Sequence, residues 1–261
     1  MKKYEDITFI IPLRCESLDR QRNLYLSLLW INKKYKSPVI VKESNIQPDA
    51  QNICNNFSNV TYIFEKCKDP LFHRTKLLND MIEMCNTKYI SNFDCDVIIP
   101  ENNVNRTIEL FDAGFDFVYP YGYGNCQKRV HESDWSQFEK TQDLSSLNTD
   151  IWSSQYGHCF FAKLDSYKKA FGENEEFLSY GPEDKERFFR FKRLGYQVGH
   201  LDNNYFVYHL EHSRTQNSWL TNPYFENNNK LLEKLNVMSD ECLQDYYNNL
   251  DYVICRKWKH N

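Results

Sequence analysis

Two aspartates, Asp94 and Asp96, follow an apolar run over residues 88–93 that has the composition of a buried strand. In an extended backbone, side chains at positions i and i+2 point to the same side, so both carboxylates would face one cation. Carboxylate oxygens favour Mg²⁺ or Mn²⁺, with phosphate oxygens completing the shell. Because open α/β sheets bind ligands at the carboxyl ends of their strands, this placement favours a metal site over a solvated turn.

Two histidines, His209 and His212, are the second candidate for metal binding. Histidines three residues apart can share a metal ion, but they are also compatible with ordinary surface positions. Zinc is conceivable here, whereas the His-Glu-x-x-His pattern of a metalloprotease is absent from the sequence.

The acidic pair Glu183 and Asp184 follows a Gly-Pro dipeptide and precedes a helix expected over residues 186–194. Acidic residues commonly stabilise the start of a helix, and the functional alternative is a general base beside an acceptor hydroxyl. Arg74 and Lys76 open another expected helix. Cations at that end oppose the helix dipole, so they indicate either a bound diphosphate or plain solvated charge.

The elements that must position these residues alternate along the first hundred residues. Strands are expected at 7–12, 39–41, 60–64 and 88–93, and helices at 24–35, 49–57 and 77–85. This alternation predicts an α/β fold with right-handed crossovers. Residues 121–150 are polar and poorly periodic, which predicts a long loop or irregular segment.

The remaining residues predict shorter elements. Strands are expected around 159–162, 197–200 and 205–208, and helices at 186–194, 225–235 and 240–250. We expect a single domain over residues 1–261, with two parts that divide near residue 100.

Composition excludes several classes of protein. With 41% hydrophobic and 26% charged residues the chain is not disordered, and its net charge of −4 argues against nucleic acid as a partner. No apolar run approaches the ~20 residues of a membrane span, which leaves peripheral association with a membrane open. Nine scattered cysteines without a Cys-x-x-Cys pair, and no secretory signal, predict a cytoplasmic protein with reduced thiols.

Nucleotide-binding fingerprints are also absent from the sequence. No Gly-x-Gly-x-x-Gly follows the first strand, and no phosphate loop of the Gly-Lys-Ser/Thr type occurs. The sequence therefore predicts a nucleotide-binding type of α/β fold without a dinucleotide or Walker site.

Five segments, taken in order, resemble one family. Residues 10–14, 72–79, 93–100, 177–184 and 209–214 are similar to segments of β-1,4-galactosyltransferase-like enzymes (family 7, related to family 2) within the GT-A glycosyltransferases. The resemblance covers roughly residues 7–214. It implies the GT-A fold, a single mixed, mostly parallel central sheet flanked by helices. Residues 1–100 would bind the nucleotide sugar, and residues 101–261 would hold the acceptor and the catalytic group.

The resemblance also implies roles on the donor side. Pro12 and Arg14 would line the uridine pocket, and Arg74, with Lys76 beside it, would contact the diphosphate. Asp94 and Asp96 would form the Asp-x-Asp motif, with Asp96 as the direct metal ligand. His212 matches the histidine ligand of the family, and His209 stands where relatives hold methionine, so the choice between the two histidines stays open.

On the acceptor side, Asp184 matches the catalytic base, and Glu183 matches an acceptor-binding carboxylate. Tyr180 stands where relatives have tryptophan, and Pro182 replaces a glycine, so the sequence departs from the family at the acceptor loop.

The activity implied is a metal-dependent inverting transfer of a sugar, such as galactose, N-acetylgalactosamine or glucose, from a UDP-sugar to a glycan or other hydroxyl acceptor. Mn²⁺ or Mg²⁺ would be the cofactor, and a bacterial or viral origin fits the absence of an anchor. The alternatives are a retaining GT-A transferase, a sugar nucleotidyltransferase, and a glycan-binding protein without activity.

Overall fold

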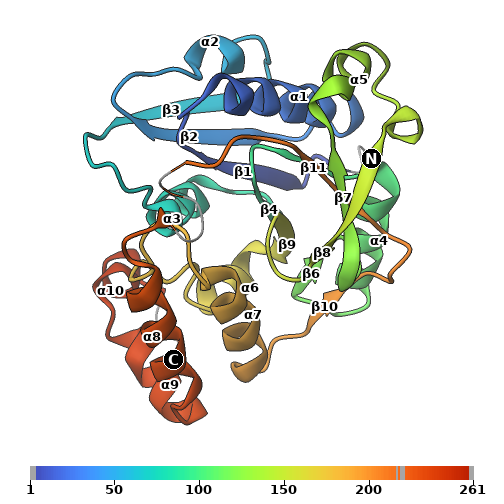
Figure 1. Ribbon diagram of the computed structural model, residues 1–261. Coiled ribbons are helices and arrows are strands. Elements are labelled where there is room, and N and C mark those ends of the chain that lie inside the picture. Colours follow the sequence, from blue (N-terminus) through green and yellow to red (C-terminus); the bar gives the residue numbers. More distant parts are fainter. Residues whose placement is uncertain (1–3, 216, 218–220, 259–261) are drawn as a thin grey trace.

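A seven-stranded sheet forms the centre of the computed structural model, which describes residues 4–258 except 216 and 218–220 (Figure 1). The strand order is β10-β6-β9-β4-β1-β2-β3, and only β9 runs antiparallel to its neighbours. The predicted mixed, mostly parallel sheet is therefore confirmed. Its strands are β1 (Ile7–Leu13), β2 (Val39–Asn45), β3 (Val60–Lys66), β4 (Tyr89–Phe93), β6 (Phe117–Tyr119), β9 (Cys159–Lys163) and β10 (Val198–His200).

Strand β1 is buried along its whole length, as its continuous apolar sequence predicts. It pairs in parallel with β2 on one side and β4 on the other. The chain first builds outward from β1 through β2 to β3 and then returns to β4 on the opposite side. This reversal places a topological switch point between β1 and β4, where ligands bind in open α/β sheets.

A second sheet, in the order β5-β11-β7-β8, lies beside the first. Its strands are β5 (Val97–Ile98), β7 (Gly124–Val130), β8 (Thr149–Ser154) and β11 (Val207–Leu210). The loop predicted over 121–150 is therefore wrong, because this segment contains β7, α5 (Trp135–Thr141) and the start of β8. Strand β7 was not predicted, because its sequence lacks an alternating apolar pattern: of its residues, only Cys126 and Val130 are buried.

Helices cover both faces of the central sheet, with α1 and α2 on one side of β1 to β3 and α3 on the other (Figure 1). Helix α2 is a single turn where a longer helix was expected, α7 begins three residues earlier than predicted, and α4, α5, α6 and α10 were not predicted. The helices, besides α5, are α1 (Leu18–Lys34), α2 (Gln51–Cys54), α3 (Arg74–Met84), α4 (Glu101–Asp112), α6 (Leu164–Lys169), α7 (Glu183–Arg193), α8 (Phe225–Asn236), α9 (Asp240–Asn248) and α10 (Asp251–Arg256).

Helices α8 to α10 gather at one end of the molecule, away from the β7–β8 hairpin (Figure 1). Within the described residues, no helix combines the length and apolar character needed to cross a bilayer.

Candidate active site

One cleft of about 550 Å³ collects nearly all of the residues singled out in the sequence. It lies at the carboxyl ends of β1 and β4 and reaches the face of the second sheet. Ten of the eleven candidate residues line it: Pro12, Arg14, Arg74, Asp94, Asp96, Tyr180, Glu183, Asp184, His209 and His212. Lys76 is the exception, because its ammonium group pairs with Asp80 at 3.1 Å and Glu65 at 3.5 Å, outside the lining of the cleft.

Asp96 meets both candidate histidines. Its carboxylate oxygens lie 3.6 Å from Nε2 of His209 and 3.2 Å from Nε2 of His212. One donor atom from each of the three residues lies within 4.8 Å of the others. One carboxylate and two imidazoles suit a divalent transition metal, and three protein ligands leave coordination positions for a substrate. The residues present therefore fit a metal ion.

Asp94 stands apart from this group of three. The chain turns at residues 95–96 instead of continuing as a strand, so the predicted extended geometry with two parallel carboxylates is wrong. Asp94 accepts a hydrogen bond from Arg74 at 2.8 Å, while Asp96 faces the histidines.

Two backbone interactions explain why residues so distant in sequence meet here. The Leu210 N–H donates to the Asp96 carbonyl at 2.8 Å, which fixes strand β11 against the turn. Ser27 in helix α1 donates to the carbonyls of Cys95 and Val97, at 3.0 Å each, and so holds the turn from the other side. The spacing of the metal candidates is therefore set by the main chain.

His209 is held in the neutral form that binds metals. Burial lowers the pKa of His209 to about 3 despite the nearby Asp96 carboxylate. A third imidazole, His158, lies 5.3 Å from the His209 ring, bonds to the Gln127 side chain at 3.2 Å, and has a pKa lowered by burial. No pattern in the sequence indicated His158, because it stands alone between two strands.

Three arginines in the cleft were also missed, and one of them, Arg129, pairs with Glu211. Arg20 in helix α1 lies 3.4 Å from Asp96 Oδ2, and only the fold brings this helix to the turn. Arg214 lines the cleft with an exposed side chain, and within the described part of the chain it has no ion-pair partner. Its place two residues after His212 was the available signal.

Arg74 bridges two carboxylates across the cleft. Besides its contact with Asp94, its guanidinium lies 3.7 Å from Asp184 Oδ1, and the whole side chain is largely buried. Its Nη1 is buried and has no hydrogen-bond acceptor among the described residues. A buried donor without an acceptor costs free energy, so this nitrogen is positioned to meet an oxygen of a ligand.

The acidic pair lies in the first turn of α7, not ahead of the helix as predicted. Glu183 is only 5% exposed, and its Oε2 has no hydrogen-bond donor among the described residues. Burial, reinforced by the charge of Asp184, raises the pKa of Glu183 to about 8. Asp184 accepts a hydrogen bond from Arg187 at 2.6 Å and lines the cleft.

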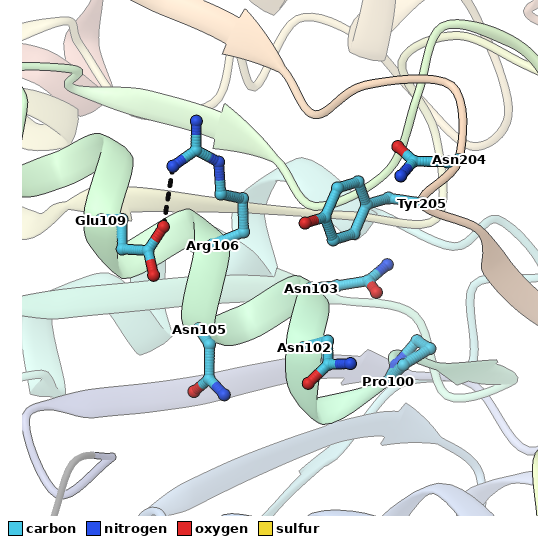
Figure 2. A pocket seen from close by; sticks show the side chains of 8 residues that line it. All are labelled: Pro100, Asn102, Asn103, Asn105, Arg106, Glu109, Asn204 and Tyr205. Carbon is cyan, nitrogen blue, oxygen red and sulfur yellow. Dashed lines mark hydrogen bonds and ion pairs between the residues drawn. The ribbon is translucent and has the colours of Figure 1, made fainter.

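A second hollow, of about 500 Å³, lies at the start of helix α4 and shares no residue with the cleft (Figure 2). Its charged groups, Arg106 and Glu109, pair with each other at 2.7 Å, and Asn105 accepts a hydrogen bond from Tyr4. Its two charged side chains are therefore already matched within the hollow.

The doubly flanked mixed sheet with a cleft at its switch point is the GT-A fold, so the predicted fold class is confirmed. A mannosyltransferase from Pyrobaculum calidifontis, solved with GDP-Man and Mn²⁺, matches with a TM-score of 0.54 and 14% identity, over 79% of this chain and 56% of that chain. The chain thus spans little more than half of that enzyme.

A second similar structure is a variant of Drosophila β1,4-galactosyltransferase 7, solved with manganese, UDP-Gal and xylobiose. It matches with a TM-score of 0.54 and 14% identity, over 87% of this chain and 78% of that chain. No protein-family model matches the sequence, and no curated protein matches it.

Proposed function

We propose that this protein is a metal-dependent inverting glycosyltransferase that moves a sugar from a UDP-sugar to a hydroxyl of a carbohydrate acceptor. The observation that carries the proposal is the joint lining of one cleft by a metal-binding group and an acidic pair. Asp96, His209 and His212 form the first, and Glu183 and Asp184 form the second. The mannosyltransferase and galactosyltransferase structures described above contain manganese and a nucleotide sugar, which supports a metal and a nucleotide-sugar donor here.

The metal site would hold the diphosphate of the donor. A bound Mn²⁺ would neutralise the charge that develops on the departing nucleoside diphosphate. Two imidazoles in the ligand set favour Mn²⁺ over Mg²⁺, since Mg²⁺ prefers oxygen ligands alone. Arg74, whose Nη1 has no hydrogen-bond acceptor among the described residues, and Arg214 would add charge-assisted hydrogen bonds to phosphate oxygens. Pro12 and Arg14, at the end of β1, would line the nucleoside side of the cleft.

The acidic pair would act on the acceptor. Asp184 would take the proton from the acceptor hydroxyl as its oxygen attacks the anomeric carbon. Glu183, protonated at neutral pH because of its raised pKa, would donate a hydrogen bond to a second acceptor oxygen. Tyr180, whose ring is half exposed at the rim of the cleft, would pack against a sugar ring.

The test is a transfer assay with a panel of nucleotide sugars that includes UDP-glucose, UDP-galactose, UDP-N-acetylgalactosamine and GDP-mannose, with Mn²⁺ and mixed glycan acceptors. We expect release of UDP, and NMR of the product should show an inverted anomeric configuration. Release of GDP alone would contradict the donor assignment. A retained configuration would contradict the role of Asp184, and absence of all release would contradict the proposed activity.

A further inference from the structure

One arginine of helix α7 is fully buried and joins three parts of the chain. Arg187 is 1% exposed and stands one helical turn after Asp184. Its Nη2 donates to Asp184 Oδ1 at 2.6 Å and to the Tyr156 carbonyl at 3.3 Å. Its Nη1 donates to both carboxylate oxygens of Glu173, at 3.0 and 2.9 Å. A planar guanidinium is suited to such forked contacts, which a lysine cannot reproduce.

Glu173 holds this guanidinium from the interior. It is 1% exposed, accepts a hydrogen bond from the Tyr167 hydroxyl, and its backbone N–H donates to Asn79 at 2.8 Å. Burial opposes the charged form of Arg187, but Glu173 and Asp184 outweigh it, and the pKa of Arg187 lies well above its usual value. The guanidinium therefore stays charged and fixed in place.

The two carboxylate oxygens of Asp184 have different partners. Oδ1 receives the Arg187 hydrogen bond and lies 3.7 Å from Arg74. Among the hydrogen bonds of the described residues, none uses Oδ2. Oδ2 faces Gly157, where a Cβ atom would lie 3.5 Å away. Arg187 also donates to the carbonyl of Tyr156, the residue next to Gly157. One side chain therefore fixes the position of the Asp184 carboxylate and of the backbone beside Gly157, which Oδ2 faces.

We infer that Arg187, held by Glu173, is a positioning residue that turns Asp184 Oδ2 toward the acceptor hydroxyl. The inference rests on the proposed function, in which Asp184 is the base. In that step the hydroxyl proton moves to Oδ2, and the acceptor oxygen forms the bond to the anomeric carbon. The bond from that carbon to the diphosphate oxygen breaks, and its electron pair leaves with the diphosphate.

The same helix supplies a matched control. Arg190 and Glu186 form a second buried ion pair one turn further along, with a 2.9 Å contact and exposures of 1% and 4%. Arg190 otherwise bonds to the carbonyls of Ala170 and Gly172 and does not line the cleft. Loss of either pair leaves a buried charge uncompensated, so both should destabilise the fold. Only the Arg187 pair should affect catalysis.

The experiment compares Arg187→Lys and Glu173→Gln with Arg190→Lys and Glu186→Gln, each as rate per folded molecule. We expect the first pair to lower kcat by about 10- to 100-fold, as misplacing a catalytic group does, with unchanged KM for the donor. The control pair should stay within about twofold of wild type in kcat. In an Asp184→Asn background, Arg187→Lys should cause no further loss, because the group that it positions is gone.

A crystal structure of the Glu173→Gln or Arg187→Lys variant gives a readout that is independent of activity. We expect the Asp184 carboxylate to swing toward Arg74. Equal kcat losses in both pairs, or an unmoved carboxylate with normal kcat, would overturn the inference. If wild type shows no transfer at all, the proposed function fails by itself, and the position of the carboxylate in the variants still decides whether Arg187 orients it.

Discussion

Asp94 and Asp96 are identical side chains two residues apart, and the structure gives them different partners. Asp96 lies between the imidazoles of His209 and His212 and beside Arg20, whereas Asp94 pairs with Arg74. The sequence predicted the importance of both residues but assigned them to one cation, because the turn between them was not visible from the apolar run before it. Their roles should therefore separate experimentally.

The first prediction concerns the metal. Asp96→Ala removes the only carboxylate of the metal-binding group, so Mn²⁺ should no longer tighten UDP binding. Calorimetry of UDP binding with and without Mn²⁺ measures this directly. Lys76→Ala is the matched control, because Lys76 lies outside the cleft. The Lys76→Ala variant should bind UDP with the same affinity as wild type. Equal enhancement by Mn²⁺ in wild type and Asp96→Ala would place the metal elsewhere.

The second prediction concerns the buried acid Glu183, whose pKa of about 8 in the folded state lies above the usual value of 4.5. Between these two pKa values the folded protein binds more protons than the unfolded chain. The contribution of Glu183 to the free energy of unfolding is therefore largest below pH 4.5, and it is lost as the pH rises through 8. Glu183→Gln stays neutral and should lose less stability between pH 5 and 9.

Chemical unfolding of wild type and Glu183→Gln at pH 5, 7 and 9 measures this difference. Glu176→Gln is a suitable control, because that carboxylate is exposed in the segment before α7 and accepts a hydrogen bond from Tyr246. If wild type and Glu183→Gln show parallel pH profiles, Glu183 is ionised in the folded protein and cannot donate a hydrogen bond to an acceptor.

At the scale of elements, helix α7 shows what the sequence could and could not predict. The helix itself was predicted, but its start was placed at residue 186, and the structure begins it at Glu183. Pro182 immediately precedes the first helical turn, where the missing N–H of a proline is no loss. This shift matters because it puts both carboxylates on the helix, where Arg187 can reach Asp184.

The connection between β8 and β9 carries the third prediction. Gly157 faces Asp184 Oδ2, and its φ lies outside the left-handed region, so alanine fits its backbone. Gly157→Ala should keep the fold and the Mn²⁺-dependent affinity for UDP, because the added methyl group contacts only the acceptor side. It should raise KM for the acceptor or lower kcat by about 10-fold, since the methyl occupies the approach to the base.

Steady-state kinetics with the acceptor varied at saturating donor measures this effect. Gly195→Ala is unsuitable as a control because its φ of +86° makes alanine strained there. Ser153→Ala is the better comparison, because Ser153 also lines the cleft, whereas Gly157 is the residue that faces Asp184 Oδ2. Normal acceptor kinetics in Gly157→Ala would show that the hydroxyl approaches from another side.

At the scale of the whole molecule, the buried parallel strands were the most predictable part. Strands β1, β2 and β4 are buried along their whole length because both faces of the sheet are covered there, and with the edge strand β3 they define the α/β class. The second sheet was not predicted, because β7 and β8 expose polar side chains and gain their order from pairing with each other and with β11. Pairing partners that lie far apart in sequence leave no local pattern.

The cleft itself is a product of the whole fold. Asp96 follows β4, Asp184 lies in the first turn of α7, and His209 lies in β11. These elements meet because the chain reverses between β1 and β4 and the second sheet lies over that point. The order of the five motifs predicted which residues would meet. It did not predict His158, Arg20 or Arg187, whose roles depend on packing.

The central claim is that Asp184 is the base of a transfer reaction, and Asp184→Asn tests it most directly. Asparagine nearly conserves the shape and can still contact Arg187, but it cannot accept the proton. We predict that the Asp184→Asn variant folds and binds UDP with the same Mn²⁺ dependence as wild type. Its rate of sugar transfer per folded molecule should fall by at least ~100-fold. Near-normal turnover in Asp184→Asn, with the same donor and acceptor, would contradict it.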